Sequence, residues 1–107
     1  MDIVYASLPR RPADDQPPLG ETAEVLGALW AHAVPDDGLE HVTCRAELDR
    51  VDLLLFLLTR NSPDAASRTA LHRAGSLLTR CHQASPLLRE RYLAPQTPAE
   101  APDGPSR

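Results

Sequence analysis

The stretch Val51-Asp52-Leu53-Leu54-Leu55-Phe56-Leu57-Leu58 decides the fold, because after Asp52 it contains no polar side chain. It is far shorter than the roughly 20 residues that a membrane-spanning helix needs. Short apolar runs bounded by turn residues are typical of strands that are buried in a sheet. We therefore predict a central strand over 51–59, with Asp49-Arg50 as the turn before it.

The residues before this strand alternate between apolar and polar. One side of the segment 39–48 carries Val42, Cys44, Ala46 and Leu48, and the other carries His41, Thr43, Arg45 and Glu47. A period of two is that of a half-exposed strand, so this segment and the 51–59 strand are expected to form a hairpin. The main alternative, one long helix over 39–60, is disfavoured because Val42-Thr43-Cys44 has poor helix propensity.

Two segments show helical periodicity. In 21–34 the residues expected on the buried face are Leu26, Leu29, Trp30, Ala33 and Val34. The second helix is expected to begin at Ser62-Pro63, a cap followed by a proline suited to the first helical turn, and to run to about Ala84. Its apolar face holds Ala66, Ala70, Ala74, Leu77, Leu78 and Cys81.

The chain ends complete a single domain, predicted over residues 1–93. A short first strand is expected over 2–8, followed by a proline-rich exposed loop over 9–20. Residues 87–93 are predicted as the last strand, although Ser85-Pro86 is also a helix start and leaves a short closing helix as the alternative. The proline-rich segment 94–107 is predicted to be a disordered tail.

The predicted order is strand, helix, strand, strand, helix, strand. It resembles the ferredoxin-like, or split βαβ, arrangement, an α+β sandwich with a four-stranded antiparallel sheet and two helices on one face. The first and third strands are central in that arrangement, which agrees with the apolar character of 51–58. Many unrelated functions share this fold, so the resemblance implies no activity.

Helices on one face of the sheet leave the other face open. Leu53, Leu55 and Leu57 point to one side of the central strand, while Leu54, Phe56 and Leu58 point to the other, and the sequence leaves open which set faces outward. Three large apolar side chains in water favour association. We predict a homodimer, or an accessory subunit that binds a protein or peptide partner, with Leu53, Leu54, Leu55, Phe56, Leu57, Leu58, Arg73 and Arg80 as candidate partner-binding residues.

No motif of catalysis, cofactor binding or metal binding stands out. His41 and Cys44 are three residues apart on a strand and project to opposite faces, so they do not favour a metal site. The chain lacks a glycine-rich phosphate loop and a Gly-x-Ser-x-Gly element. We expect no catalytic residues, no cofactor and no metal. The alternative is a small cofactor-free enzyme or ligand-binding protein that resembles the dimeric α+β barrels, with Tyr5, Trp30 and His41 as its candidate residues.

The charge pattern argues against nucleic-acid binding. All 11 basic residues are arginines, a bias that GC-rich codon usage explains, and the formal net charge is −4. The chain has neither a membrane-spanning stretch nor an N-terminal secretory signal, so we expect a cytoplasmic protein that contacts no membrane. Its 2 cysteines are then expected to be thiols.

Overall fold

A computed structural model describes residues 1–12, 18–59 and 69–100. Along the chain its elements are strand β1 (Asp2–Pro9), helix α1 (Glu21–His32), the 3-10 helix η1 (Pro35–Asp37), strands β2 (Leu39–Ala46) and β3 (Arg50–Leu57), helices α2 (Ala70–Ala84) and α3 (Pro86–Arg91), and the short strand β4 (Ala99–Glu100).

The four strands form one antiparallel sheet in the order β2-β3-β1-β4. β3 pairs with β1 over its whole length, from Leu57 opposite Asp2 to Arg50 opposite Pro9. Its other neighbour is β2, so the predicted hairpin forms. The two strands are joined by residues 47–49, and Arg50, expected in the turn, is the first residue of β3. The predicted position of the apolar strand inside the sheet is therefore confirmed.

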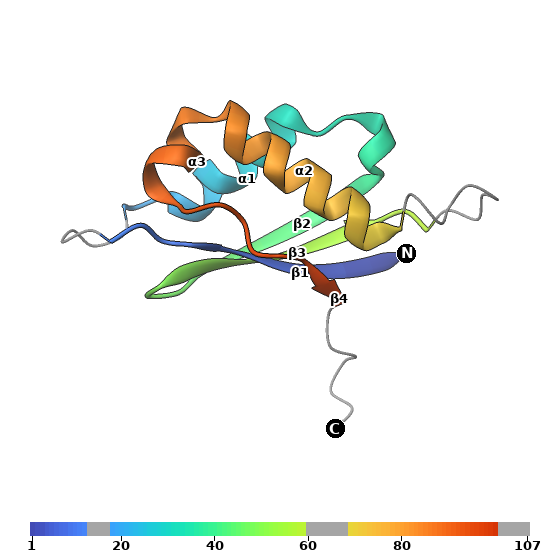
Figure 1. The fold of residues 1–107 in the computed structure, drawn as a ribbon, viewed down its shortest axis with the longest axis horizontal. Helices are drawn as coiled ribbons and strands as arrows, with labels where there is room; N and C mark the ends of the chain where they lie inside the picture. Colours follow the sequence, from blue (N-terminus) through green and yellow to red (C-terminus); the bar gives the residue numbers. More distant parts are fainter. Residues whose placement is uncertain (13–17, 60–68, 101–107) are drawn as a thin grey trace, which may run out of the picture.

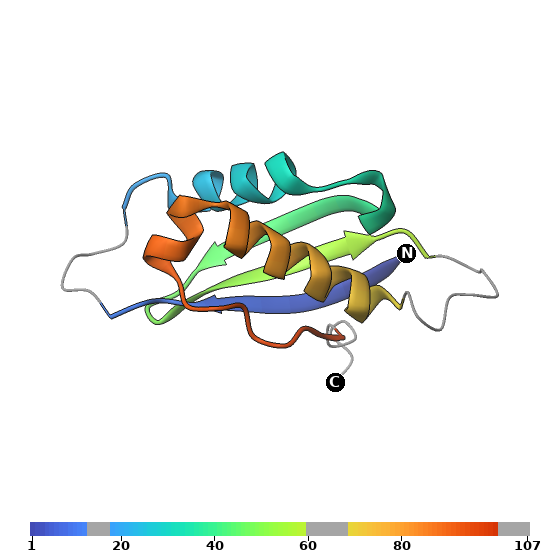
Figure 2. The same cartoon turned by 45° about the horizontal axis from the view of Figure 1, so that its top comes forward.

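The helices form a single layer on one face of the sheet. Figures 1 and 2 show α1, α2 and α3 on the same side, with α1 and α2 lying next to each other. The core lies between this layer and the sheet, and its largest fully buried side chains are Leu8, Leu29, Leu53, Leu55, Leu57, Leu77, Leu78, Leu88 and Tyr92. The fold is thus an α+β domain with two layers and one core.

The end of the domain differs from the expected strand over 87–93. The segment forms α3 instead, because the Ser85 hydroxyl accepts a hydrogen bond from the backbone N–H of Leu88 (3.2 Å) and Pro86 fits the first helical turn. The helix brings Leu88 and Tyr92, four residues apart, into the core. The predicted strand was wrong, and the closing helix was correct.

The fourth strand is instead formed by residues of the predicted tail. Ala99 and Glu100 pair with Tyr5 and Val4, and the backbone N–H of Gln96 donates to the carbonyl of Ser7 (3.1 Å). Residues 94–100 are therefore ordered along β1, contrary to the expected disordered tail. The remainder of that prediction, 101–107, lies outside the described residues.

Helix α1 buries a different face from the expected one. Its fully buried residues are Glu21, Val25 and Leu29, at a spacing of four, whereas Trp30 and Val34 are each 46% exposed. The carboxylate of Glu21 accepts hydrogen bonds from the guanidinium of Arg10 and from the hydroxyl of Tyr92. These contacts draw the Glu21 side into the core and turn Trp30 toward solvent.

Helix α2 begins at Ala70, later than expected, and its buried face agrees with the prediction at Ala74, Leu77, Leu78 and Cys81. The Thr69 hydroxyl caps it by accepting from the backbone N–H of His72 (3.1 Å), and the residues buried along it are Arg73, Ala74, Leu77, Leu78 and Cys81. The predicted start at Ser62 lies outside the described residues. Among the helices that the structure describes, none has the length and apolar character needed to cross a membrane.

Candidate interaction surface

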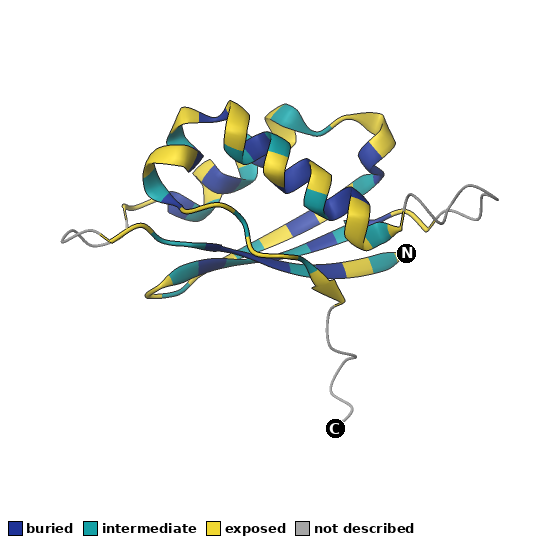
Figure 3. Ribbon diagram, viewed as in Figure 1, coloured by how far each residue is buried: buried dark blue, intermediate teal, exposed yellow. Residues whose placement is uncertain are grey.

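The two sides of β3 differ in exposure, and this settles which apolar triplet faces outward. Leu53, Leu55 and Leu57 are 0% exposed beneath the helices and belong to the core. We had included them among the candidate partner-binding residues, but their side chains are not accessible to a partner. Leu54 and Phe56 are half-buried on the opposite side. Figure 3 shows buried segments, in dark blue, both in the strands and in the helices that cover them. The open face of the sheet is therefore the face that carries Leu54 and Phe56.

Strand register arranges this open face in three rows across β1, β3 and β2. The first row is Ile3, Phe56 and His41, the second is Tyr5, Leu54 and Thr43, and the third is Ser7, Asp52 and Arg45. The first two rows contain no carboxylate or guanidinium group. Directly opposite side chains in a sheet lie in contact, so these rows form one apolar patch.

The apolar patch is only partly covered by its own members. Ile3 is 43% exposed, and the rings of His41 and Phe56 have centroids 5.4 Å apart at an interplanar angle of 51°. Leu58, just beyond the end of β3, is also 43% exposed. Thus Leu54, Phe56 and Leu58, of the original candidates, remain accessible to a partner.

The third row is polar, and its carboxylate, Asp52, accepts hydrogen bonds from two side chains outside the row. The Tyr5 hydroxyl donates to Oδ1 of Asp52 (2.7 Å), and Nε of Arg50 donates to the same oxygen (2.8 Å). Burial favours a raised pKa for Asp52, but these two hydrogen bonds outweigh it and leave the pKa of the carboxyl lowered.

The same cluster keeps the Tyr5 proton in place. Its hydrogen bond to Asp52 raises the pKa of the phenol, and burial adds to the effect. A neutral phenol bound to an ionised carboxylate is neither a nucleophile nor a ready base at neutral pH. The cluster therefore fixes side chains at one end of the open face.

Arg73 and Arg80 have structural partners on the helical side of the sheet. Arg73 is only 4% exposed and donates to the carbonyls of Asp37 (3.1 Å) and Leu58 (3.0 Å). Arg80 forms an ion pair with Asp37 (2.7 Å) and donates to the carbonyl of His32 (3.1 Å). Both lie in the layer opposite the open face, so the structure does not place them with Leu54 and Phe56 in one partner-binding surface.

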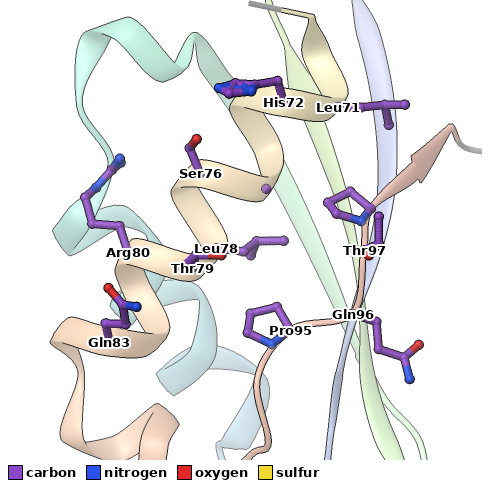
Figure 4. A pocket seen from close by; sticks show the side chains of 12 residues that line it. Leu71, His72, Ser76, Leu78, Thr79, Arg80, Gln83, Pro95, Gln96 and Thr97 are labelled. Atoms are coloured by element: carbon purple, nitrogen blue, oxygen red, sulfur yellow. The ribbon is translucent and has the colours of Figure 1, made fainter.

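The residues of the alternative enzyme hypothesis do not come together. Tyr5 and His41 lie on the open face, whereas Trp30 lies on α1 in the helical layer. A groove of about 600 Å³ lies between α2 and residues 95–98 (Figure 4), and none of the three residues lines it. Its lining includes His72, Ser76 and Thr79 of α2 beside Pro95 and Pro98.

The cysteines and the candidate metal ligands also remain apart. Cys81 is buried and Cys44 is half-buried, and burial raises the pKa of each thiol to about 11. In the described part of the chain, no three side chains of histidine, cysteine, aspartate or glutamate gather closely enough to hold a metal ion.

Sequence reasoning missed Ile3 and Thr43 as members of the open face. The alternation in 39–48 did place Thr43 on a polar side, and the same period of two in β1 separates Ile3 from the buried Val4. Joining them to Leu54 and Phe56 requires the register between the three strands, which the sequence does not contain.

Comparisons with known proteins add nothing to this description: the chain matches no family model, and searches of curated proteins and solved structures return no match.

Proposed function

We propose that this chain is a non-catalytic interaction module that forms a homodimer through the open face of its sheet. The observation that carries the proposal is the apolar patch formed by the first two rows, Ile3, Phe56 and His41 with Tyr5, Leu54 and Thr43, which no element of the described chain covers. In our interpretation the strand order is that of the ferredoxin-like arrangement, with β1 and β3 central and α3 as an addition.

A second copy suits this face better than a strongly charged partner. Two sheets pack face to face at about 10 Å, so apolar rows can cover the same rows of the other copy. The third row carries both a carboxylate, Asp52, and a guanidinium, Arg45, so it can meet its own copy without setting only like charges against each other. A two-fold axis lying between the sheets makes one surface serve as both halves of the contact.

The free energy available is appreciable. Complete burial of a leucine or phenylalanine side chain contributes roughly 1.5–3 kcal/mol. For a side chain that is already half-buried, about half of this free energy is still available on association. Leu54, Phe56 and Ile3 of two copies together offer several kcal/mol of further burial. That is enough to offset part of the entropy lost on association.

Sedimentation equilibrium over about a hundredfold dilution tests the proposal. We expect the wild-type chain to self-associate, and Leu54→Asp to halve the mass of the assembly because it places an unpaired charge inside the apolar patch. Thr43→Glu introduces a charge at an exposed position of the second row and is expected to have the same effect with less risk to folding.

Leu48→Asp is the matched control, since Leu48 is 92% exposed in the turn between β2 and β3. It should leave the assembly unchanged. A wild-type chain that is monomeric at all concentrations would overturn the homodimer, even if it bound apolar dyes. Self-association that survives both Leu54→Asp and Thr43→Glu without loss of mass would exclude the open face as its site.

A further inference from the structure

One side chain of the apolar patch, His41, belongs to a residue type that changes its charge near neutral pH. Histidine ordinarily gains or loses a proton between pH 5 and 8. Tyr5, the other ionisable member of the first two rows, keeps its proton there, because its hydrogen bond to Asp52 raises the pKa of the phenol. His41 is exposed in the single chain, so its imidazole exchanges protons with solvent.

The imidazole of His41 lies against Phe56. The two rings have centroids 5.4 Å apart and are tilted by 51°, a distance at which aromatic rings attract each other. Phe56 stands next to His41 in the first row, at the centre of the surface that a second copy would cover. Covering Phe56 therefore also removes the imidazole from water.

The strand that carries His41 supplies no partner for a charge on its ring. None of the ion pairs found within 1–12, 18–59 and 69–100 includes His41 or Glu40. Glu40 precedes His41 where the register between β2 and β3 is irregular, and its side chain is exposed. Arg45, in the third row, is paired with Glu47 (3.0 Å). An imidazolium at His41 is thus unpaired on β2.

The neighbouring strands bring neutral groups to the same ring. On β3 the carboxylate of the open face is Asp52, which lies four residues from Phe56, or roughly 13 Å along the strand. It already accepts hydrogen bonds from two other side chains. On β1 the first two rows contain Ile3 and Tyr5, and both are uncharged at neutral pH.

We propose that His41 makes the open-face contact sensitive to pH, so that a proton taken up from solvent by its imidazole dissociates the dimer. This inference rests on the proposed homodimer. There, apolar rows cover the same rows of the other copy, which contain no carboxylate, so the proton leaves an unpaired charge out of water. In the single chain the imidazolium stays hydrated and is attracted by the ring of Phe56. The proton therefore binds the single chain more tightly, and acid favours dissociation.

The overall charge of the chain changes in the opposite sense. The formal net charge is −4 with the histidines neutral, and protonation of the 4 histidines takes it toward zero. Repulsion between copies then decreases, which favours association. A dimer that weakens in acid therefore does not owe the change to its net charge.

Sedimentation equilibrium at about pH 8 and about pH 5.5 tests the proposal. We expect the dissociation constant of the wild-type dimer to be at least about tenfold higher at the lower pH. His41→Gln has a polar side chain that takes up no proton, so the ratio of its two constants should fall to within about twofold. His72→Gln is the matched control, since His72 is exposed on α2 in the helical layer, and it should keep the wild-type ratio.

A wild-type dimer with the same constant at both pH values would overturn the role of His41 and leave the homodimer standing. The same holds if His41→Gln keeps the pH dependence, because another group would then carry it. A rise in the constant that coincides with loss of the helical circular dichroism signal would also overturn it, since unfolding would be the response to acid. A wild-type chain that is monomeric at both pH values would instead overturn the homodimer itself.

Discussion

Glu21 is an acidic side chain that is only 3% exposed, and several parts of the chain meet at it. Arg10, which follows β1, binds its carboxylate with both terminal nitrogens of the guanidinium and also donates to the carbonyl of Glu47 in the turn before β3. Tyr92, which follows α3, donates its hydroxyl to the same carboxylate. Through this buried carboxylate, the cluster connects α1 with the turn between β2 and β3 and with the residue that follows α3.

We predict that Glu21→Gln lowers the free energy of unfolding by about 3 kcal/mol at neutral pH, because it leaves Arg10 without its buried counter-ion. Urea unfolding followed by circular dichroism measures the loss. Glu24→Gln is the control, since Glu24 is 44% exposed in its pair with Arg91 and such pairs contribute less than about 1 kcal/mol. Equal decreases in the free energy of unfolding of the two variants would show that the buried cluster stabilises the fold no more than an exposed ion pair does.

The same carboxylate makes stability depend on pH. Burial alone would raise the pKa of Glu21, but the hydrogen bonds from Arg10 and Tyr92 outweigh it and hold the pKa below its ordinary 4.5. Its contribution is therefore present above pH 4.5 and is lost as the pH falls through the lowered value. In Glu21→Gln, the free energy of unfolding should fall less steeply as the pH is lowered below 4.5. The part of the pH dependence that is due to Asp52 should remain.

At the level of elements, the short helix α3 depends on its cap. Ser85 is 7% exposed, and its hydroxyl accepts from the N–H of Leu88 in the first turn. We predict that Ser85→Ala lowers the free energy of unfolding by about 1 kcal/mol, the usual cost of losing a serine cap. Ser76→Ala, at an exposed position inside α2, is expected to change it by less than about 0.5 kcal/mol in thermal or urea unfolding.

The contrast between α3 and the hairpin shows what sequence patterns can decide. The alternation in 39–48 and the apolar run in 51–59 favoured two strands over one long helix, and both strands form, as Leu39–Ala46 and Arg50–Leu57. Residues 87–93 are too few to show a period. Tyr92 favours a strand and Ser85-Pro86 favours a helix start, so the sequence alone does not decide between them. The cap prevailed because α3 buries Leu88 and Tyr92 together.

The faces of α1 could not be predicted for a different reason. Leu26, Leu29 and Trp30 form one apolar stripe in the sequence, and Val25 with Leu29 forms another. The stripe of Val25 and Leu29 is the buried one, because Glu21 lies on the same side of the helix and binds Arg10 and Tyr92. These two residues are 11 and 71 residues away along the chain. A glutamate is normally evidence against burial, so the exposure of Trp30 follows only from the tertiary contacts.

At the scale of the whole molecule, the open face lies on a chain that carries four more negative than positive charges. Copies of such a chain repel each other over a distance of about the Debye length, roughly 10 Å at 0.1 M salt. Apolar contacts are themselves nearly insensitive to moderate salt, whereas contacts made by arginines on an acidic partner weaken as salt is added. The salt dependence of self-association therefore distinguishes the two kinds of contact.

We predict that raising sodium chloride from about 0.05 M to about 0.5 M strengthens self-association several-fold, because screening removes the repulsion between copies while the apolar patches remain. Dissociation constants from sedimentation equilibrium at each salt concentration measure the effect. Arg89→Gln, which makes the net charge more negative at an exposed position of α3 away from the open face, should bind less tightly than the wild-type chain at low salt and equally well at high salt. If added salt instead weakened the wild-type assembly about tenfold, ion pairs rather than Leu54 and Phe56 would be holding the copies together.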